Sequence, residues 1–269
     1  MARSPNTDRP RLAIVTGASS GLGFAFAHRL AREGSDLMLV ARNRERLDAC
    51  AAELATTCGV TVETIAADLS QPETAALVFA RLAALGRRAD VLVNNAGFNL
   101  YGRFEKSDLD REIEMIRLHA IAVTQLSKLF VQARDRSRVN RMVNVASVAA
   151  LVPGPYVSVH FATRAHLLSF SLALSEEFRG TDVSVTCLCP GPMRSDFFRR
   201  AGMTDVRLAS GWPMKSMAPS DVATCGYDAM LRGRAMVIPG RRNRIFAVFA
   251  RIAPRQLRVR FTRWIMGRT

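Results

Sequence analysis

The sequence predicts an α/β fold with a doubly wound parallel sheet, because apolar runs of strand length alternate with longer amphipathic stretches from Leu12 to about Pro239. Strict alternation of this kind is typical of parallel strands joined by helices that cover both faces of the sheet. A length of 269 residues with 49% hydrophobic residues suits a single domain. We therefore expect one domain over residues 11–240, after a flexible N-terminus (residues 1–10) and before a basic helical extension (residues 241–269).

The alternation predicts seven strands and six helices in this domain. The strands are expected at residues 12–16, 36–41, 61–66, 90–94, 140–146, 183–189 and 235–238. The helices are expected near residues 22–33, 43–57, 71–85, 107–134, 156–179 and 219–231. The irregular stretch 190–218 follows the carboxyl end of a strand, where such folds place substrate loops. Its large apolar side chains, which predict a largely apolar substrate, are Met193, Phe197, Phe198, Met203, Trp212 and Met214.

Cysteine spacing and the N-terminal sequence indicate the compartment. The five cysteines form no CxxC or Cys/His ligand spacing, and MARSPNTDRP lacks the apolar core of a signal peptide. We therefore expect a cytoplasmic protein without a structural metal. Cys187 and Cys189 alternate with Leu188 in a strand-like run, so they are interpreted as small buried hydrophobic residues.

A glycine-rich turn links the first expected strand to the first expected helix. Its sequence is Thr16-Gly17-Ala18-Ser19-Ser20-Gly21-Leu22-Gly23. Glycines permit a tight turn and a close approach of the backbone to a pyrophosphate, which would lie at the positive N-terminus of the helix. The context of strand, turn and helix therefore predicts dinucleotide contacts from Gly17, Ser19, Ser20, Gly21, Leu22 and Gly23.

Three further motifs follow later strands in the same order as in a known family. Asn94-Asn95-Ala96-Gly97 follows the fourth strand, Ser147 ends the fifth, and Pro190-Gly191 follows the sixth. Together with the glycine turn, they make the chain resemble the short-chain dehydrogenase/reductase family over roughly residues 10 to 240. The resemblance implies a Rossmann-type fold, a nicotinamide cofactor and a small-molecule substrate. It also implies a homodimer or homotetramer, paired through the helix over residues 156–179.

The end of the second strand favours NADP(H) over NAD(H). A carboxylate there would bind the ribose 2′-hydroxyl, whereas a cation matches a 2′-phosphate, and this chain has Ala41 followed by Arg42. The alternative is that Arg42 belongs with Arg44 and Arg46 to a solvated helix start. The other cofactor contacts implied by the resemblance are Asp68, Leu69, Asn95, Ala96, Gly97, Arg164, Pro190, Gly191, Met193 and Ser195.

The catalytic positions depart from the family, which uses Asn, Ser, Tyr and Lys. Thirteen residues separate the family's serine from its tyrosine, and Ser147 is followed at that distance by His160. Arg164 then occupies the lysine position, and His119 aligns with the asparagine. Histidine exchanges protons near neutral pH without help, but a nearby guanidinium disfavours imidazolium, and Arg164 cannot relay a proton. Tyr156, one turn before His160, is an alternative hydroxyl.

Three functions stay open on these residues. The favoured hypothesis is an NADP(H)-dependent reductase of a C=N, activated C=C or C=O group, in which His160 or water supplies the proton. The second is a non-redox isomerase, dehydratase or cyclase that uses His160 and His119 as an acid/base pair. The third is a catalytically inactive NADP(H)-binding protein.

The C-terminal extension concentrates the charge of the chain. Residues 232–269 hold eleven arginines and no acid, so that of a net charge of +15 they account for +11 and the preceding residues for +4. Apolar residues alternate with these arginines, and Pro254 divides the segment. Two hypotheses fit equally: two basic amphipathic helices lie on an anionic membrane or a partner, or a solvated extension packs on the domain. Nucleic-acid binding is not expected, because no recognition motif accompanies the charge.

Overall fold

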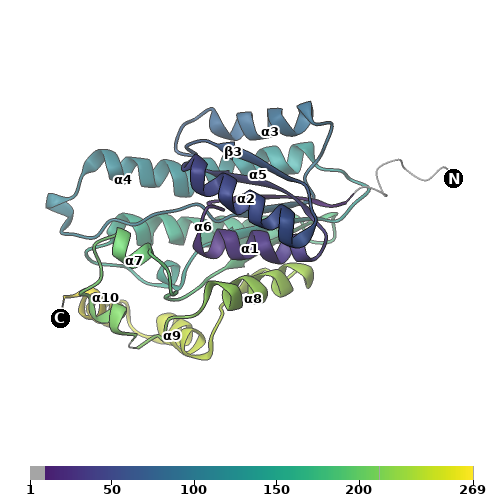
Figure 1. Cartoon of the computed structure of the whole chain (residues 1–269). Helices are drawn as coiled ribbons and strands as arrows, with labels where there is room; N and C mark the ends of the chain where they lie inside the picture. The colour runs from purple at the N-terminus through teal and green to yellow at the C-terminus, as the bar shows by residue number, and fades with distance from the viewer. Residues whose placement is uncertain (1–9, 212, 269) are drawn as a thin grey trace.

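A seven-stranded parallel sheet forms the centre of the protein, as the computed structural model shows for residues 10–211 and 213–268 (Figure 1). The strand order is β3-β2-β1-β4-β5-β6-β7, and every neighbouring pair is parallel. The strands are β1 (Leu12–Thr16), β2 (Asp36–Ala41), β3 (Val62–Ala66), β4 (Val91–Asn94), β5 (Asn140–Val145), β6 (Val183–Leu188) and β7 (Met236–Val237). The predicted doubly wound α/β fold is therefore confirmed.

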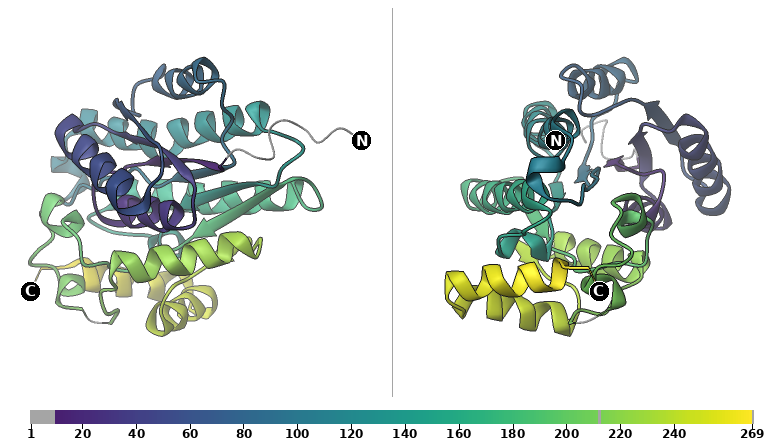
Figure 2. Two further views of the ribbon diagram at one scale, coloured as in Figure 1. Left: turned by 45° about the vertical axis from the view of Figure 1, so that its right-hand side comes forward. Right: turned by 90° about the vertical axis from the view of Figure 1, so that its left-hand side faces the viewer.

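Helices cover both faces of the sheet, because successive strand residues point to opposite sides. Ala13 and Val15 of β1 face one helical layer, whereas Leu12 and Ile14 face the other. The first layer holds α1 (Gly21–Arg32), α2 (Arg44–Cys58) and α8 (Pro219–Leu231). The second holds α3 (Thr74–Ala84), α5 (Val123–Ala133) and α6 (Ser158–Glu177) (Figure 2). All strands are buried on both faces except β3 and the exposed start of β7.

The chain reverses its strand order between β1 and β4. From β1 the first half of the chain builds outward through β2 to β3, and the second half builds outward from β4 to β7. Ligands of open parallel sheets bind in the crevice outside the carboxyl ends of the strands at such a point. The glycine turn after β1 and the Asn-Asn-Ala-Gly motif after β4 both lie there.

The long helix expected over residues 107–134 contains a break in its hydrogen-bond pattern. It comprises α4 (Leu109–Ile116), a π-helical segment (Arg117–Ala122) and α5. A π segment widens one turn of a helix, and such turns occur often at functional sites. This one contains His119.

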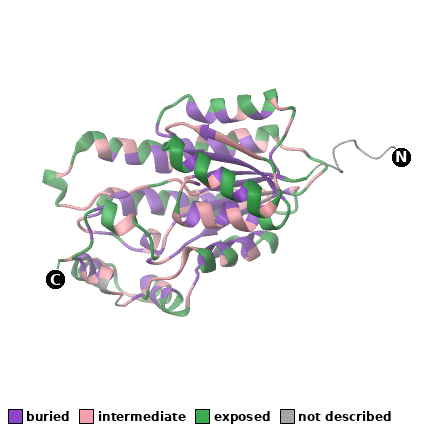
Figure 3. Cartoon of the chain, in the orientation of Figure 1, coloured by how far each residue is buried: buried purple, intermediate pink, exposed green. Residues whose placement is uncertain are grey.

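The two C-terminal helices pack against the domain and form a hairpin around Pro254. They are α9 (Arg241–Ile252) and α10 (Arg255–Met266), and their aromatic rings meet at Phe249 and Phe261, with centroids 5.1 Å apart. Their inner side joins an apolar cluster with η3 (Val148–Leu151) and the stretch after β6. That stretch contains α7 (Phe197–Arg200) and η4 (Arg207–Ser210). The packed-extension hypothesis therefore describes the inner side, and the outer side stays exposed (Figure 3).

Some expectations concern residues that the structure does not describe. Of the N-terminus expected to be flexible (residues 1–10), only Pro10 is among the described residues. Trp212 and Thr269 also lie outside the described residues. Cys187 and Cys189 are fully buried, with their sulfur atoms 3.7 Å apart, as expected for small hydrophobic residues of a strand. All five cysteines are free thiols.

Candidate active site

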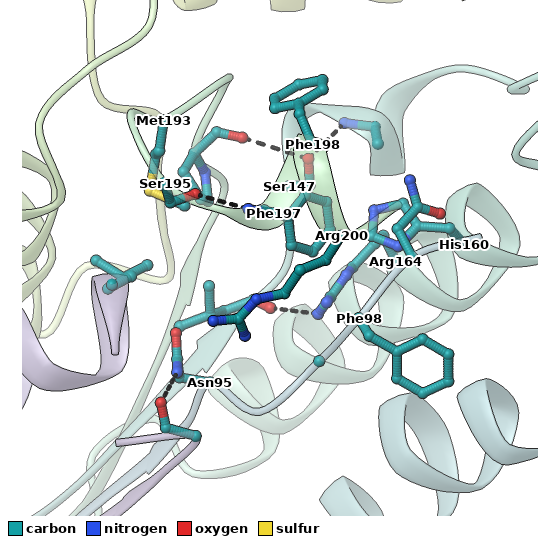
Figure 4. A pocket seen from close by; sticks show the side chains of 18 of the residues that line it. Asn95, Phe98, Ser147, His160, Arg164, Met193, Ser195, Phe197, Phe198 and Arg200 are labelled. Atoms are coloured by element: carbon teal, nitrogen blue, oxygen red, sulfur yellow. Dashed lines mark hydrogen bonds between the residues drawn. The ribbon is translucent and has the colours of Figure 1, made fainter. Parts of the chain in front are cut away.

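One continuous cavity of about 910 Å³ runs along the carboxyl ends of the strands. It begins at the glycine turn and ends against α9 and α10. Between these ends it passes Ser147, His160 and Arg164 (Figure 4). All but one of the predicted cofactor contacts line it. The exception is Gly23, which supports the turn from behind. The cavity is at the upper end of the usual size of small-molecule sites, as a dinucleotide together with a second reactant would require.

The glycine turn packs closely against the end of β4. Gly17 and Gly21 have φ angles of +66° and +56°, which favour glycine. A Cβ on Gly23 would lie 2.5 Å from Asn95 Nδ2 and closer still to the Gly17 carbonyl oxygen. Thr16 Oγ1 accepts hydrogen bonds from the backbone amides of Asn95 and Ala96, at 2.9 and 3.0 Å. The ends of β1 and β4 are therefore fixed to each other beside the turn.

The first turn of α1 suits an anion. The Ser20 side chain makes no capping hydrogen bond, and the first turn carries no acidic residue. Backbone N–H groups at the start of a helix need acceptors, and the helix dipole favours a negative charge there. This end of the cavity therefore fits a pyrophosphate.

Arg42 lines the cavity near this turn but is already paired. Its Nη1 lies 2.9 Å from Glu114 Oε1 and 3.9 Å from Asp68 Oδ2. The pairing is exposed to solvent, and exposed ion pairs are weak, so a phosphate can replace Glu114. Arg46 and Asn43 also line the cavity, and sequence reasoning did not assign them a role. Arg42 precedes the N-cap of α2 and Arg46 lies in its first turn, so the run of arginines at the helix start could have revealed it.

Arg164 is a buried cation at the centre of the site. Its Nη1 donates to the Val145 carbonyl at 2.8 Å, and its Nη2 lies 3.3 Å from His119 Nε2. Its Nε is buried without a hydrogen-bond partner, and within the described residues no carboxylate pairs with it. Burial lowers the pKa of Arg164 to about 10, so it stays charged at neutral pH. A buried, incompletely satisfied guanidinium favours a polar or anionic ligand beside it.

His119 is fully buried behind the cavity wall and is not one of its lining residues. Its Nδ1 lies 2.9 Å from Thr163 Oγ1, whose own hydroxyl hydrogen is donated to the His160 carbonyl. Its Nε2 accepts from the Phe98 amide at 3.2 Å. These partners require a neutral ring protonated on Nδ1. Burial, reinforced by the charge of Arg164, lowers the pKa of His119 well below its usual value.

His160 lies between His119 and Phe197, with ring centroids 5.7 Å from each. It lines the cavity, yet only 6% of its surface is exposed. Its Nδ1 is buried without a hydrogen-bond partner. Burial, followed by the charge of Arg164, lowers the pKa of His160 to about 3. The ring is therefore neutral throughout the physiological range.

Ser147 lines the cavity and keeps a hydroxyl that can turn to a ligand. Its Oγ accepts from the Ala149 amide at 3.1 Å and donates a long hydrogen bond of 3.3 Å to the Pro190 carbonyl. Tyr156, the alternative hydroxyl, does not line this cavity. It has a φ angle of +70°, and its ring packs against Tyr101 at 6.0 Å. The structure therefore gives Tyr156 a place in the loop before α6 and not in the site.

The far end of the cavity is built by side chains that sequence reasoning missed. Phe246 of α9 and Thr262, Ile265 and Met266 of α10 line it. Tyr101 holds this wall in place, because its hydroxyl donates to the Met266 carbonyl at 2.7 Å. Met193, Phe197, Phe198, Met203 and Met214 line the same cavity, as expected of the 190–218 stretch. No motif marks the α9 and α10 residues. The only signal in the sequence is the helical spacing of their apolar residues, which gives each helix an apolar side.

Comparison with known proteins identifies the family. The model of the family described as short chain dehydrogenase matches residues 11–205, and the chain belongs to this family. The chain is 31% identical over 180 residues to 17-beta-hydroxysteroid dehydrogenase type 3 of Homo sapiens, which covers 66% of this chain and 57% of that protein. It is also 31% identical over 199 residues to very-long-chain 3-oxoacyl-CoA reductase-A of Danio rerio, over 72% of this chain and 60% of that protein. The chain thus spans little more than half the length of these relatives.

A solved structure of higher coverage shows the same fold. A short-chain dehydrogenase from Sphingobium yanoikuyae in complex with NADPH superposes with a TM-score of 0.78 at 32% sequence identity. The match covers 86% of this chain and 88% of that one. That protein binds NADPH in its structure.

Proposed function

We propose that this chain is an NADP(H)-dependent oxidoreductase that reduces an electron-poor C=C or C=O group of a small, largely apolar molecule. The observation that carries the proposal is the single cavity that joins the phosphate-binding turn to Ser147, His160 and Arg164. The names of the relatives, a dehydrogenase and a reductase, and the NADPH of the Sphingobium structure support it.

Residues along the cavity fit the parts of NADP(H). The glycine turn and the N-terminus of α1 would hold the pyrophosphate, and Arg42 with Arg46 would hold the 2′-phosphate. Arg164 would donate its unpartnered Nε–H, or an Nη–H, to the ribose hydroxyls. When bound, NADP(H) supplies the hydride.

The proton of the reduction comes from water in this proposal. His160 is neutral at pH 7, and neutral imidazole is a very weak acid. Arg164 stays protonated, and both nitrogens of His119 are occupied. As hydride adds to carbon, the electron pair moves to the acceptor oxygen, which the Ser147 hydroxyl and the Arg164 charge stabilise. A water then protonates the oxygen or the adjacent carbon, and the hydroxide left behind is neutralised by the solvent.

The charge of the cavity discriminates between the three acceptor groups that the sequence leaves open. Its lining contains far more arginines than acids. The arginines are Arg42, Arg46, Arg111, Arg164, Arg194 and Arg200, and the acids are Asp68 and Asp196. Such a field disfavours the cationic iminium form in which a C=N group accepts hydride, and it favours an acceptor that becomes negative. The C=N hypothesis is therefore the least supported of the three.

The two alternative functions differ in what supports them. A non-redox enzyme would need His119 and His160 as an acid/base pair, but His119 is engaged on both sides and the pKa of His160 is about 3. We therefore assign His119 to the positioning of Arg164. An inactive NADP(H)-binding protein stays an outcome of the experiment below.

The proposal is tested by NADPH oxidation with a panel of enones, ketones and cyclic imines. We expect turnover with enones or ketones and weaker turnover with imines. The His160→Ala variant should keep at least a tenth of the wild-type rate, because a tenfold loss corresponds roughly to the loss of one weak hydrogen bond. A loss of about a thousandfold in His160→Ala would show that His160 is the essential acid. NADPH binding without any turnover would favour the inactive binding protein. Carbonyl reduction that appears only in the double variant His160→Tyr, Arg164→Lys would show that the site has decayed.

We further infer a homodimer or homotetramer, paired through α6, in the cytoplasm. Leu172 of α6 and Ile121 of the neighbouring π-helical segment are exposed apolar side chains, at 38% and 48%, in support of such pairing. Sedimentation equilibrium of the wild type and of a Leu172→Glu variant tests it: the variant should shift toward the monomer, and unchanged mass in both would contradict the α6 interface.

A further inference from the structure

The outer sides of α9 and α10 carry exposed apolar stripes. Ile245, Val248 and Ile252 follow each other at helical spacing on α9, and Leu257 and Trp264 do so on α10. Their exposed fractions are 69%, 58%, 75%, 49% and 45%. The five residues are called the outer stripe below. Clustered exposure of this kind usually marks an interaction surface.

Arginines surround the outer stripe. Arg241, Arg242 and Arg251 are exposed on α9, and Arg255, Arg260 and Arg263 are exposed on α10. Residues 232–269 contain no acid at all, so the surface is uniformly cationic. Both helices lie along one end of the molecule, opposite α3 (Figures 1 and 2). Apolar residues set among cations are typical of a surface that enters the headgroup region of an anionic bilayer.

Other occupants fit this surface less well. A second copy would present the same arginines and would be repelled. Nucleic acid would engage the arginines but would leave three exposed aliphatic side chains of α9 in water. No described helix is long and apolar enough to cross a bilayer. We propose that the outer stripe and its arginines dock the α9–α10 hairpin on the surface of an anionic lipid bilayer.

The docking surface is directly connected to the cavity. Phe246, Ile265 and Met266 line the cavity from the inner sides of the same two helices. The bilayer surface would therefore lie one helix diameter, about 10 Å, from the substrate end of the cavity. Docking would therefore hold this end of the cavity close to the bilayer surface. The docking proposal itself does not depend on the proposed reaction.

Vesicle co-sedimentation tests the docking. The full chain should bind vesicles of phosphatidylcholine with phosphatidylglycerol, bind phosphatidylcholine alone weakly, and lose affinity as salt rises. Substitution of Arg241, Arg242 and Arg251 by Gln should weaken binding roughly a hundredfold, at about fivefold for each charge near the surface. The matched control substitutes Arg32, Arg88 and Arg103, three arginines exposed elsewhere, and should leave most of the affinity.

The apolar part is tested separately. Substitution of Ile245, Val248 and Ile252 by Gln should weaken binding by roughly tenfold or more, because each side chain loses its burial in the interface. The control substitutes Leu77, Val139 and Leu231, which are exposed at other places. In a Trp212→Phe variant, which leaves Trp264 as the sole tryptophan, brominated lipids should quench the fluorescence.

Four results would overturn the proposal: equal binding of neutral and anionic vesicles, equal losses in the control and test variants, no quenching by brominated lipids, or tighter binding to duplex DNA than to anionic vesicles. Dissociation of an oligomer by the outer-stripe variants would instead assign the surface to contacts between copies. Unchanged circular dichroism of each variant shows that the loss is not one of folding; the substituted arginines and aliphatic residues are exposed, and such substitutions change stability little.

Discussion

The two ends of the cavity obtain their properties in different ways. At the phosphate end, glycines and backbone amides form the site, and its charged side chain, Arg42, is exposed and exchanges partners easily. At the reaction end, the cation and both histidines are buried, and each depends on its neighbours for its protonation state. The phosphate end is therefore fixed by backbone geometry, whereas the reaction end is fixed by side-chain packing. Acid and single substitutions should affect the two ends separately.

Acid should destabilise the reaction end first. In the folded state the pKa of His119 is lowered well below its usual value and that of His160 is lowered to about 3. Below about pH 6.5 the unfolded chain therefore binds protons that the folded chain does not, so stability is lost as the pH falls toward each lowered pKa. Each histidine should lower the free energy of unfolding by about 1.4 kcal/mol per pH unit in this range. Urea unfolding between pH 7.5 and 5 measures this slope, and His160→Phe should reduce it by the contribution of one proton. Equal slopes in the wild type and His160→Phe would contradict the burial of a neutral ring.

Gly23→Ala should damage the phosphate end without affecting the reaction end. The added methyl group would overlap the Gly17 carbonyl, so the turn must shift. We expect dinucleotide affinity to fall roughly tenfold to a hundredfold, equally for NADPH and NADH, at the usual cost of overpacking. Isothermal titration calorimetry measures both. Gly102→Ala is the control, because a Cβ there meets nothing within 4 Å. A loss confined to NADPH would refute the backbone argument.

Arg42→Ala should separate the two cofactors. Loss of a charged hydrogen bond to the 2′-phosphate should weaken NADPH binding about tenfold to a hundredfold and leave NADH binding unchanged. Arg44→Ala is the control, because Arg44 pairs with Asp48 and does not line the cavity. Glu114→Gln should tighten NADPH binding slightly, since it removes the present partner of Arg42. If Arg42→Ala leaves NADPH binding unchanged, as Arg44→Ala should, the solvated-helix interpretation is correct.

Tyr101→Phe should have the smallest effect. It removes the hydrogen bond to the Met266 carbonyl and should lower the free energy of unfolding by about 1 kcal/mol. Hydrogen exchange of the α10 amides should rise, while exchange at the glycine turn should not. A uniform rise over the whole chain would show that the two ends are coupled more tightly than the contrast implies.

Sequence reasoning located the residues at the glycine-turn end of the cavity because glycine content and strand-turn-helix order are local properties of the chain. Gly17, Gly21 and Arg42 line the cavity as expected, and their contacts with a phosphate stay a prediction. His160 and Arg164 could also be located, since they lie a fixed number of residues after Ser147. Their protonation states could not, because burial and the approach of His119 from another helix set them.

The wall from α9 and α10 could not be predicted for a similar reason. The composition of the extension shows its charge and its apolar residues, and it permits both a packed and a membrane-bound helix pair. Which residues face inward depends on where Pro254 turns the chain and on contacts such as Phe246 with the cluster around η3. Those contacts join residues about 100 positions apart, which no local pattern records.

The placement of α9 and α10 separates two parts of the cavity wall along the chain. Phe246, Thr262, Ile265 and Met266 belong to the last two helices of the described residues, whereas the glycine turn precedes the first helix. An exchange of the terminal hairpin alone would therefore replace one wall of the cavity and leave the glycine turn as it is. The wall from the stretch after β6 would stay with the rest of the domain.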